Sequence, residues 1–200
     1  MEQKYYRSGM LALVLLFAPT LVVANTTDCT QLGSVNLVQN CGFETGDFTG
    51  WTEGNALDPY VGVSFASSAA HSGDYYAALG SQFSDNSLYQ DLTTQVGEQY
   101  VFAFYLASDG EAPSDFTARW NGNVVFSEAP VPNQDYTLES FLVTATSTTT
   151  RIEFDFRNDP GWSRLDDVEV FVPEPSGSFW GALLLGCPLF GFLRLGKSPR

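Results

Sequence analysis

Side chains that commonly do catalytic chemistry are sparse in this sequence. His71 is the sole histidine of the 200 residues and is a weak candidate for a general base. Gly62-Val63-Ser64-Phe65-Ala66 only approximates the turn that carries a nucleophilic serine, because it lies in a strand-like run with no helix after it. Glu153 and Asp155 could in principle cleave a glycoside, but any acidic chain supplies such pairs. The sequence therefore predicts a protein that is not an enzyme.

Aromatic side chains offer a different chemistry, the recognition of sugars. A sugar ring presents both C–H patches and hydroxyl groups, so it binds to exposed aromatic faces that have hydrogen-bonding groups beside them. Three tryptophans and, behind them, three tyrosines are the candidates between the two hydrophobic ends: Trp51, Trp120, Trp162, Tyr60, Tyr89 and Tyr105.

Packing competes with sugar binding for each of these rings. Trp120 shares a strand face with Phe116 and Ala118, which favours the core, and a core position is also expected for Trp51. Trp162 follows Asp159-Pro160-Gly161 in a turn and is the ring most expected to be exposed. The ligand-binding residues predicted from the sequence are Trp162, Trp120 and Tyr89.

Charge is distributed unevenly along the chain. The net charge is −14, from 9 Lys and Arg against 23 Asp and Glu. Residues 25–172 hold 21 of the acidic residues and only four of the basic ones, all arginine, which gives them a net charge of −17. Such a surface repels a phosphate backbone, so nucleic acid is excluded as a partner.

The N-terminal end reads as an export signal. Lys4 and Arg7 precede an apolar run from Met10 to Ala18, and the segment closes on Val22-Val23-Ala24. This order predicts a secretory signal peptide over residues 1–24, cleaved after Ala24. An uncleaved membrane anchor is the alternative, which Pro19 and the shortness of the run disfavour.

The C-terminal end contains Pro173-Glu174-Pro175, then an apolar run from Phe179 to Leu193 and a basic tail with Arg194, Lys197 and Arg200. This order resembles the PEP-CTERM sorting signal. The resemblance implies that an exosortase-type enzyme of the inner membrane cuts the chain near the tripeptide and delivers the protein to the cell envelope or extracellular matrix of a Gram-negative-type bacterium. Residues 173–200 would then be held in the membrane only before processing. A plain membrane anchor is the alternative, although fifteen helical residues rise only about 22 Å.

The cysteine count agrees with export. Removal of the tail takes away Cys187 and leaves an even pair, Cys29 and Cys41, in an oxidising compartment. We expect a disulfide between them, which would contribute roughly 3 kcal/mol by the chain-entropy estimate. Two isolated thiols also lack the ligand spacing of a zinc site.

Residues 25–172 read as one all-β domain. Apolar residues alternate in short runs between turn residues, as in Tyr100, Phe102, Phe104 and Leu106, and no helical period of useful length is present. Asn121-Gly122 is a strong hairpin signal. Strands are predicted over 35–39, 60–66, 75–79, 88–93, 99–107, 116–120, 124–127, 136–145, 150–157 and 165–171.

Three segments of this domain resemble galactose-binding-like jelly-roll domains, which include several carbohydrate-binding modules. They are the opening segment from Asn36 to Trp51, the segment His71-Ser72-Gly73-Asp74-Tyr75-Tyr76-Ala77, and the closing strand Leu165-Asp166-Asp167-Val168-Glu169-Val170. The resemblance implies a jelly-roll sandwich of two antiparallel sheets.

The same resemblance implies a structural calcium ion between the opening segment and the last strand. Its ligands would be the Gly42 carbonyl, the Glu44 side chain, an oxygen near Asp74, and an aspartate of the last strand, since calcium takes six to eight oxygen ligands. Strict alternation places Asp166 on the face of Val168 and Val170, which favours Asp166 over Asp167 as the ligand. Hydrogen bonding of Glu44 and Asp166 to loop amides is the alternative.

These observations predict an exported, non-catalytic, calcium-stabilised jelly-roll domain that binds carbohydrate or exopolysaccharide. A structural matrix protein without a defined ligand is the second hypothesis, which burial of all three tryptophans would favour. A small glycan-active hydrolase is the third, and it requires two convergent carboxylates roughly 5 to 10 Å apart.

Overall fold

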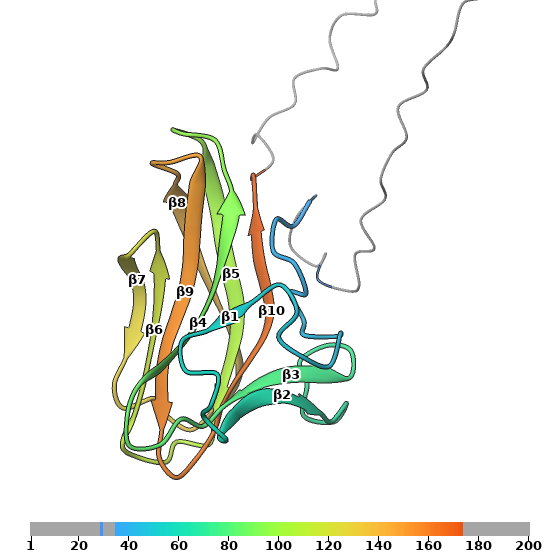
Figure 1. Cartoon of the computed structure of the whole chain (residues 1–200), viewed down its shortest axis with the longest axis vertical. Helices are drawn as coiled ribbons and strands as arrows, with labels where there is room; N and C mark the ends of the chain where they lie inside the picture. The colour runs from blue at the N-terminus through green and yellow to red at the C-terminus, as the bar shows by residue number, and fades with distance from the viewer. Residues whose placement is uncertain (1–28, 30–34, 174–200) are drawn as a thin grey trace, which may run out of the picture.

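The computed structural model describes residue 29 and residues 35–173. The predicted signal peptide and the Glu174–Arg200 part of the sorting segment, with its hydrophobic helix, lie outside the described residues. Within the described part no helix is long and apolar enough to cross a membrane. Ten strands and the connections between them make up the fold (Figure 1).

Two five-stranded antiparallel sheets face each other. The first sheet has the order β1-β4-β9-β6-β7, and the second has the order β2-β3-β10-β5-β8. The strands of the first sheet are Thr52–Glu53, Asn86–Thr93, Thr149–Asn158, Ser114–Trp120 and Asn123–Glu128. Those of the second sheet are Val61–Phe65, Tyr75–Leu79, Ser163–Phe171, Gln99–Ser108 and Gln134–Thr144. Most neighbouring strands are distant in sequence, so the chain crosses repeatedly between the sheets, and the predicted jelly-roll sandwich is confirmed.

The core lies between the sheets and is rich in aromatic residues. On β5 the alternating residues predicted to share a face are all buried, and on β9 Ile152, Phe154 and Phe156 are completely buried. The Phe154 ring contacts Phe104 from the opposite sheet, with ring centroids 5.1 Å apart. Among the described residues, the ten strands lie between Thr52 and Phe171, and the buried hydrophobic residues lie between Cys29 and Phe171.

Local sequence explains most strand boundaries. The predicted Asn121-Gly122 hairpin is confirmed, because these two residues join β6 to β7 with positive φ angles of 48° and 80°. The strand predicted over 35–39 is wrong. Asn36 there uses its side chain to bind the backbone of Val168 and Val170, so the segment lies along β10 without forming a ladder. The two-residue strand β1 was not predicted.

The expected disulfide is present between Cys29 and Cys41, with the two Cα atoms 5.9 Å apart. Both cysteines are buried at the edge of the core. The disulfide holds Cys29 next to Gly42, since a Cβ atom placed on Gly42 would lie 3.3 Å from the Cys29 sulfur. It therefore ties the start of the described chain to the opening segment of the domain.

Candidate functional site

Small side chains form a row across the outer face of the second sheet. Gly62 on β2 pairs with Ala78 on β3, which pairs with Arg164 on β10, which pairs with Ala107 on β5. Directly opposed residues of antiparallel strands share a face. The next row of paired residues, which includes Ala77 and Leu165, faces the core. The row that contains Ala78 and Arg164 therefore faces outward. Arg164 is thus a long side chain that stands between two alanines.

Trp162 rises at one end of this row, immediately before β10. A Cβ atom on Gly80 would lie 2.5 Å from the Trp162 ring, so only glycine at position 80 lets the indole pack this closely on the backbone. The Trp162 amide donates to Asp109 Oδ2 over 2.7 Å, which fixes the turn that carries the ring. The indole keeps 39% of its surface exposed, as the sequence predicted for this tryptophan.

Strands β2, β3 and β10 and the loops that carry Asp109 and Trp162 line an open pocket of about 330 Å³ on the outer face of the second sheet. Its lining residues are Ser64, Tyr76, Ala78, Asp109, Trp162 and Arg164, hereafter the Trp162 pocket. Ser64 and Tyr76 are paired across β2 and β3 and point to the same side. The pocket combines two aromatic rings, a hydroxyl and a guanidinium, which is the mixture of apolar and hydrogen-bonding groups that sugars require.

Asp109 is the one carboxylate that lines the Trp162 pocket, and the loops around it already use its oxygens. Oδ1 accepts from the Glu111 amide at 3.2 Å and from Asn158 Nδ2 at 3.2 Å, while Oδ2 accepts from Trp162. Asp109 therefore holds the loops in place. Of the pocket's lining residues no second carboxylate faces it, so the paired acids of a glycoside hydrolase are not present there.

A buried pair of acids lies beside this face, where the loop 66–74 covers β10. Asp166 Oδ2 accepts hydrogen bonds from the amides of His71 at 2.8 Å and Ser72 at 3.4 Å. Asp167 accepts from the Ser72 hydroxyl at 2.7 Å, and its other oxygen lies 2.6 Å from His71 Nδ1. The His71 ring stacks on Tyr105 at 3.5 Å between centroids. His71, weak as a predicted catalytic base, thus joins a loop to the last strand.

The predicted orientation of Asp166 is wrong. Alternation put it on the face of Val168 and Val170, but it pairs with Tyr105 on the outward side of the sheet. The register shifts between Asp166 and Glu169, and Asp167 adopts a positive φ of 45°. This bulge breaks the two-residue period on which the prediction depended.

Burial has a strong electrostatic effect on this acidic pair. Asp166 and Asp167 are almost completely inaccessible to solvent. Burial raises the pKa of Asp166 to about 8, with a further contribution from the negative charge of Asp167. A cation beside the pair would remove the cost of holding two carboxylates in a poorly solvated place.

The other predicted calcium ligands lie around the same loop. Gly42 contacts the pair, since its Cβ position is 3.6 Å from Asp166 Oδ1. The Glu44 carboxylate accepts from the amides of Asp74 at 3.0 Å and Tyr75 at 2.9 Å, and Asp74 itself is exposed. These bonds match the alternative expectation, in which Glu44 accepts hydrogen bonds from loop amides. In residue 29 and residues 35–173, no three His, Cys, Asp or Glu side chains group as a metal site. A calcium shell would therefore need mainly carbonyl oxygens besides Asp166, and calcium accepts these.

The predicted sugar-binding residues do not come together. Trp120 as a sugar ligand is wrong, because it is only 4% exposed, stacks on Tyr100 and Phe102, and donates its Nε1 hydrogen to the Thr144 carbonyl at 2.9 Å. Trp51 is also buried. Tyr89 lies on the outer face of the first sheet, with the Arg151 guanidinium 3.8 Å above its ring. Trp162 is the one residue of the predicted set in the pocket.

Sequence reasoning missed the other members of the Trp162 pocket. Tyr76 and Ser64 are polar residues on strands that otherwise contribute small or apolar ones, and Arg164 precedes the buried Leu165. Alternation could have placed these three on the outward face of the sheet. It could not have shown that Gly80 and Asp109 bring Trp162 beside them, because those contacts join separate loops.

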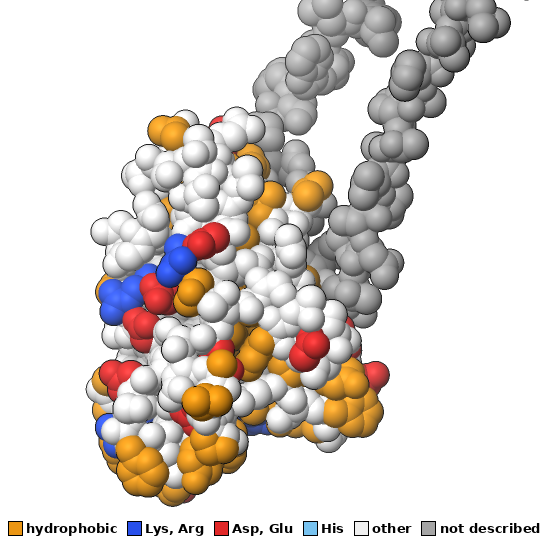
Figure 2. Space-filling view, in the orientation of Figure 1, with side chains coloured by type: hydrophobic (Ala, Val, Ile, Leu, Met, Phe, Trp, Pro, Cys, Tyr) orange, Lys and Arg blue, Asp and Glu red, His pale blue; other side chains and the backbone are white. Residues whose placement is uncertain are grey.

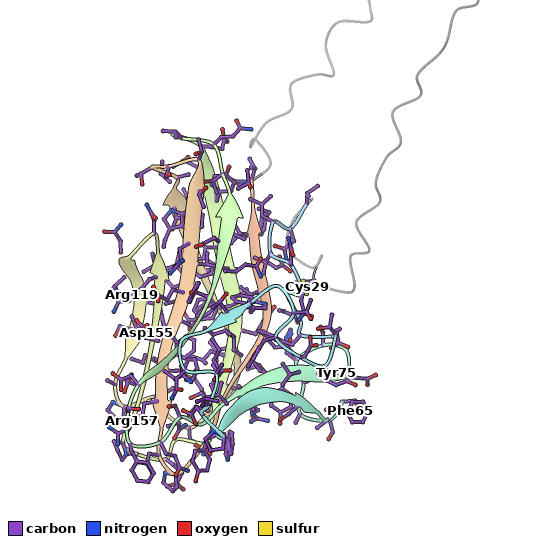
Figure 3. The ribbon with its side chains drawn as sticks, viewed as in Figure 1. Cys29, Phe65, Tyr75, Arg119, Asp155 and Arg157 are labelled. Carbon is purple, nitrogen blue, oxygen red and sulfur yellow. A yellow bond between two sulfur atoms is a disulfide. The ribbon has the colours of Figure 1, made fainter. Side chains whose placement is uncertain are left out.

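A second hollow, of about 380 Å³, lies on the outer face of the first sheet. Polar and charged groups line it, among them Asp85, Asp115, Arg119 and Asp155, and its lining has no aromatic ring. Burial raises the pKa of Asp115, with Asp85 adding to the effect. Figure 3 shows Arg119 and Asp155 together on this side of the sandwich. Without a stacking surface this hollow fits a sugar less well than the Trp162 pocket.

No family model and no curated protein sequence matches this chain. Among solved structures, TmCBM61 in complex with β-1,4-galactotriose is 22% identical with a TM-score of 0.59, covering 70% of this chain and 100% of that one. The C-terminal family 22 carbohydrate-binding module of Clostridium thermocellum Xyn10B is 14% identical with a TM-score of 0.51, covering 70% and 97%. The enzymatically active domain of tailspike protein 4 of bacteriophage CBA120 is 12% identical with a TM-score of 0.54, covering 70% and 22%. At these identities the likeness establishes the fold, which is the jelly-roll sandwich found in carbohydrate-binding modules.

Proposed function

We propose that this domain is a non-catalytic carbohydrate-binding module and that it binds glycan in the Trp162 pocket. The observation that carries the proposal is an exposed indole held rigidly beside a second aromatic ring and hydrogen-bonding groups. Its pocket of about 330 Å³ falls in the size range of small-molecule sites. A structural matrix protein without a ligand is the second candidate; burial of every tryptophan would favour it, and Trp162 is exposed.

Glycan arrays with residues 25–173 would test this function. We expect binding to at least one glycan, and Trp162→Ala should weaken that binding by roughly 10-fold, because stacking on an aromatic ring contributes about 0.5 to 1.5 kcal/mol beyond the area that it buries. Tyr89→Ala is the matched control, since it removes an aromatic ring from the opposite sheet. The absence of any bound glycan, or equal affinity of the Trp162→Ala variant, would overturn the proposal.

Calcium is proposed as a structural ion beside Asp166, with the Gly42 carbonyl as a further ligand. The buried Asp166–Asp167 pair supports it, because a divalent cation would neutralise two carboxylates that solvent does not reach. When bound, the ion would stabilise the junction of the opening segment and the last strand. Calcium should raise the melting temperature relative to chelator in the wild type and not in Asp166→Asn. An unchanged melting temperature in the wild type would exclude this role.

Export and sorting are proposed from the two ends of the sequence, with an exosortase-type enzyme as processing partner. The fold supports a tethered arrangement, because β10 starts beside the Trp162 pocket and runs away from it to Phe171, just before Pro173. Figure 1 shows the turn between β9 and β10 and the far end of β10 at opposite ends of the sandwich. Nine strand residues span roughly 30 Å. Replacing Pro173, Glu174 and Pro175 by alanine should reduce the amount of protein released from the inner membrane, and unchanged fractionation would contradict the proposal.

A further inference from the structure

Arg164 differs from the other arginines of the described chain in having no ionic partner. Arg119, Arg151 and Arg157 each bind an aspartate, at 2.6, 2.7 and 3.3 Å. In residue 29 and residues 35–173, no carboxylate lies within ion-pair distance of the Arg164 guanidinium. In a domain with a net charge of −17, an arginine without such a partner is exceptional.

Arg164 is half-buried, and its neighbours across the sheet offer its guanidinium no ionic or hydrogen-bonding partner. Its two cross-strand neighbours, Ala78 and Ala107, are too short to shield it or to bond with it. Asp109 lines the same pocket, but its oxygens are occupied by the amides of Glu111 and Trp162 and by Asn158. The guanidinium carbon lies 5.6 Å from the centre of the Tyr136 ring.

A free guanidinium in a ligand pocket selects for a particular chemistry. Arginine is charged at every physiological pH and presents a planar fork of N–H donors that matches a carboxylate bidentately. The overall negative charge of the domain acts weakly on a bound anion, because at physiological salt charges beyond about 8 Å are largely screened. The charges within the pocket therefore decide, and these are the Arg164 guanidinium, which has no ionic partner, and the Asp109 carboxylate, whose oxygens already accept hydrogen bonds from the surrounding loops.

We propose that the Trp162 pocket binds glycans that carry a carboxylate, that is, uronic-acid polymers, with Arg164 holding the carboxylate and Trp162 stacking on the sugar ring. This inference rests on the proposed function of the pocket and names its substrate class. Tyr76 and Ser64, on the other side of Arg164, would then face the hydroxyl groups of the same residue or of its neighbour.

The test compares polymers that differ only in charge. Polygalacturonate and its methyl-esterified form are titrated calorimetrically into residues 25–173, and alginate and its carboxyl-reduced form serve as a second pair. At least one acidic polymer should bind roughly 10-fold to 100-fold more tightly than its neutral counterpart, as expected for hydrogen bonds to a charged group. The preference should weaken as salt is raised.

Two variants separate charge from geometry. Arg164→Gln should abolish the preference for the acidic polymer over its neutral counterpart, and Arg164→Lys, which keeps the charge but loses the fork, should retain only part of that preference. Melting curves confirm that both variants are folded. Equal binding of acidic and neutral polymers, or a preference that survives in Arg164→Gln, would overturn this inference and leave the glycan-binding function standing. Weakened binding of every glycan in Trp162→Ala is the separate measure of that function.

Discussion

The two outer faces of the sandwich use their charged residues in opposite ways. Over β6 and β9 of the first sheet, basic and acidic side chains lie side by side (Figure 2), and Arg119 and Arg151 are bonded to Asp155 and Asp91. On the second sheet Arg164 stands among alanines, and the acidic pair Asp166–Asp167 is buried under a loop. On the first face Arg119 and Arg151 each have an ionic partner, whereas Arg164 on the second face has none.

Cross-strand neighbours account for this difference. Arg151 on β9 pairs directly with Asp91 on β4, and Arg119 on β6 pairs with Glu153 on β9, so each arginine meets a carboxylate. Opposite charges facing each other on antiparallel strands stabilise the sheet. The residues that pair with Arg164 on the two neighbouring strands are both alanines. The number of charges on a face is therefore a poorer guide to function than the number left without a partner.

The largest effect that we expect comes from displacing the Trp162 ring from its pocket on the second face. In Gly80→Val the new side chain would collide with the Trp162 ring, because even a Cβ atom there would lie 2.5 Å from it. The ring must move out of the pocket, so glycan affinity should fall as far as in Trp162→Ala. Overpacking should also lower the free energy of unfolding by about 1 to 3 kcal/mol. Calorimetric titration and urea unfolding measure the two effects.

Gly62→Ala is the matched control for that variant. Gly62 lies on the same face of the second sheet, and a Cβ atom added to it meets no atom within 4 Å. Its stability should change by less than about 0.5 kcal/mol. If Gly80→Val binds glycan as the wild type does, Trp162 is not the stacking surface.

The second expected effect is that the free energy of unfolding depends on pH in opposite ways through Asp166 on the second face and Asp91 on the first. The pKa of Asp166 is raised from 3.8 to about 8, so between these values the folded state holds a proton that the unfolded state has released. Its contribution to stability therefore falls as the pH rises from about 4 to 8 and is constant above that. The groups that face Asp166 are Asp167, His71 and Tyr136. In chelator, urea unfolding should show a flatter pH profile for Asp166→Asn than for the wild type.

For Asp91 on the first face, the expected pH dependence of stability has the opposite sign. The hydrogen bond from Arg151 lowers the pKa of Asp91, so its contribution is present above the unfolded pKa and is lost as the pH falls through the folded one. Asp91→Asn should flatten the acid limb of the profile and leave the range from pH 5 to 8 unchanged. Identical profiles for Asp166→Asn and the wild type would show that Asp166 is ionised across that range.

Alternation along the strands predicted most of this fold. Nine of the ten strands lie at or within two residues of their predicted bounds, and Phe102, Phe104, Phe154 and Phe156 are buried as expected, because a two-residue period places every second side chain in the core. That period has no information about a bulge, so the orientation of Asp166 was missed. It also has no information about loops that meet in space. The exposure of Trp162 could therefore be predicted, but the pocket around it could not.

The smallest expected effect concerns the ion pair between Arg119 and Asp155 on the first face. The two side chains are 33% and 29% exposed, and water screens such a pair, so Asp155→Asn should cost less than about 1 kcal/mol of unfolding free energy. The loss should shrink further at high salt. Glycan affinity should not change, because Asp155 lies on the sheet opposite the Trp162 pocket. A weakened affinity in this variant would place part of the binding surface on the first sheet, and the polar hollow lined by Asp85, Asp115 and Arg119 would then be the surface to mutate next.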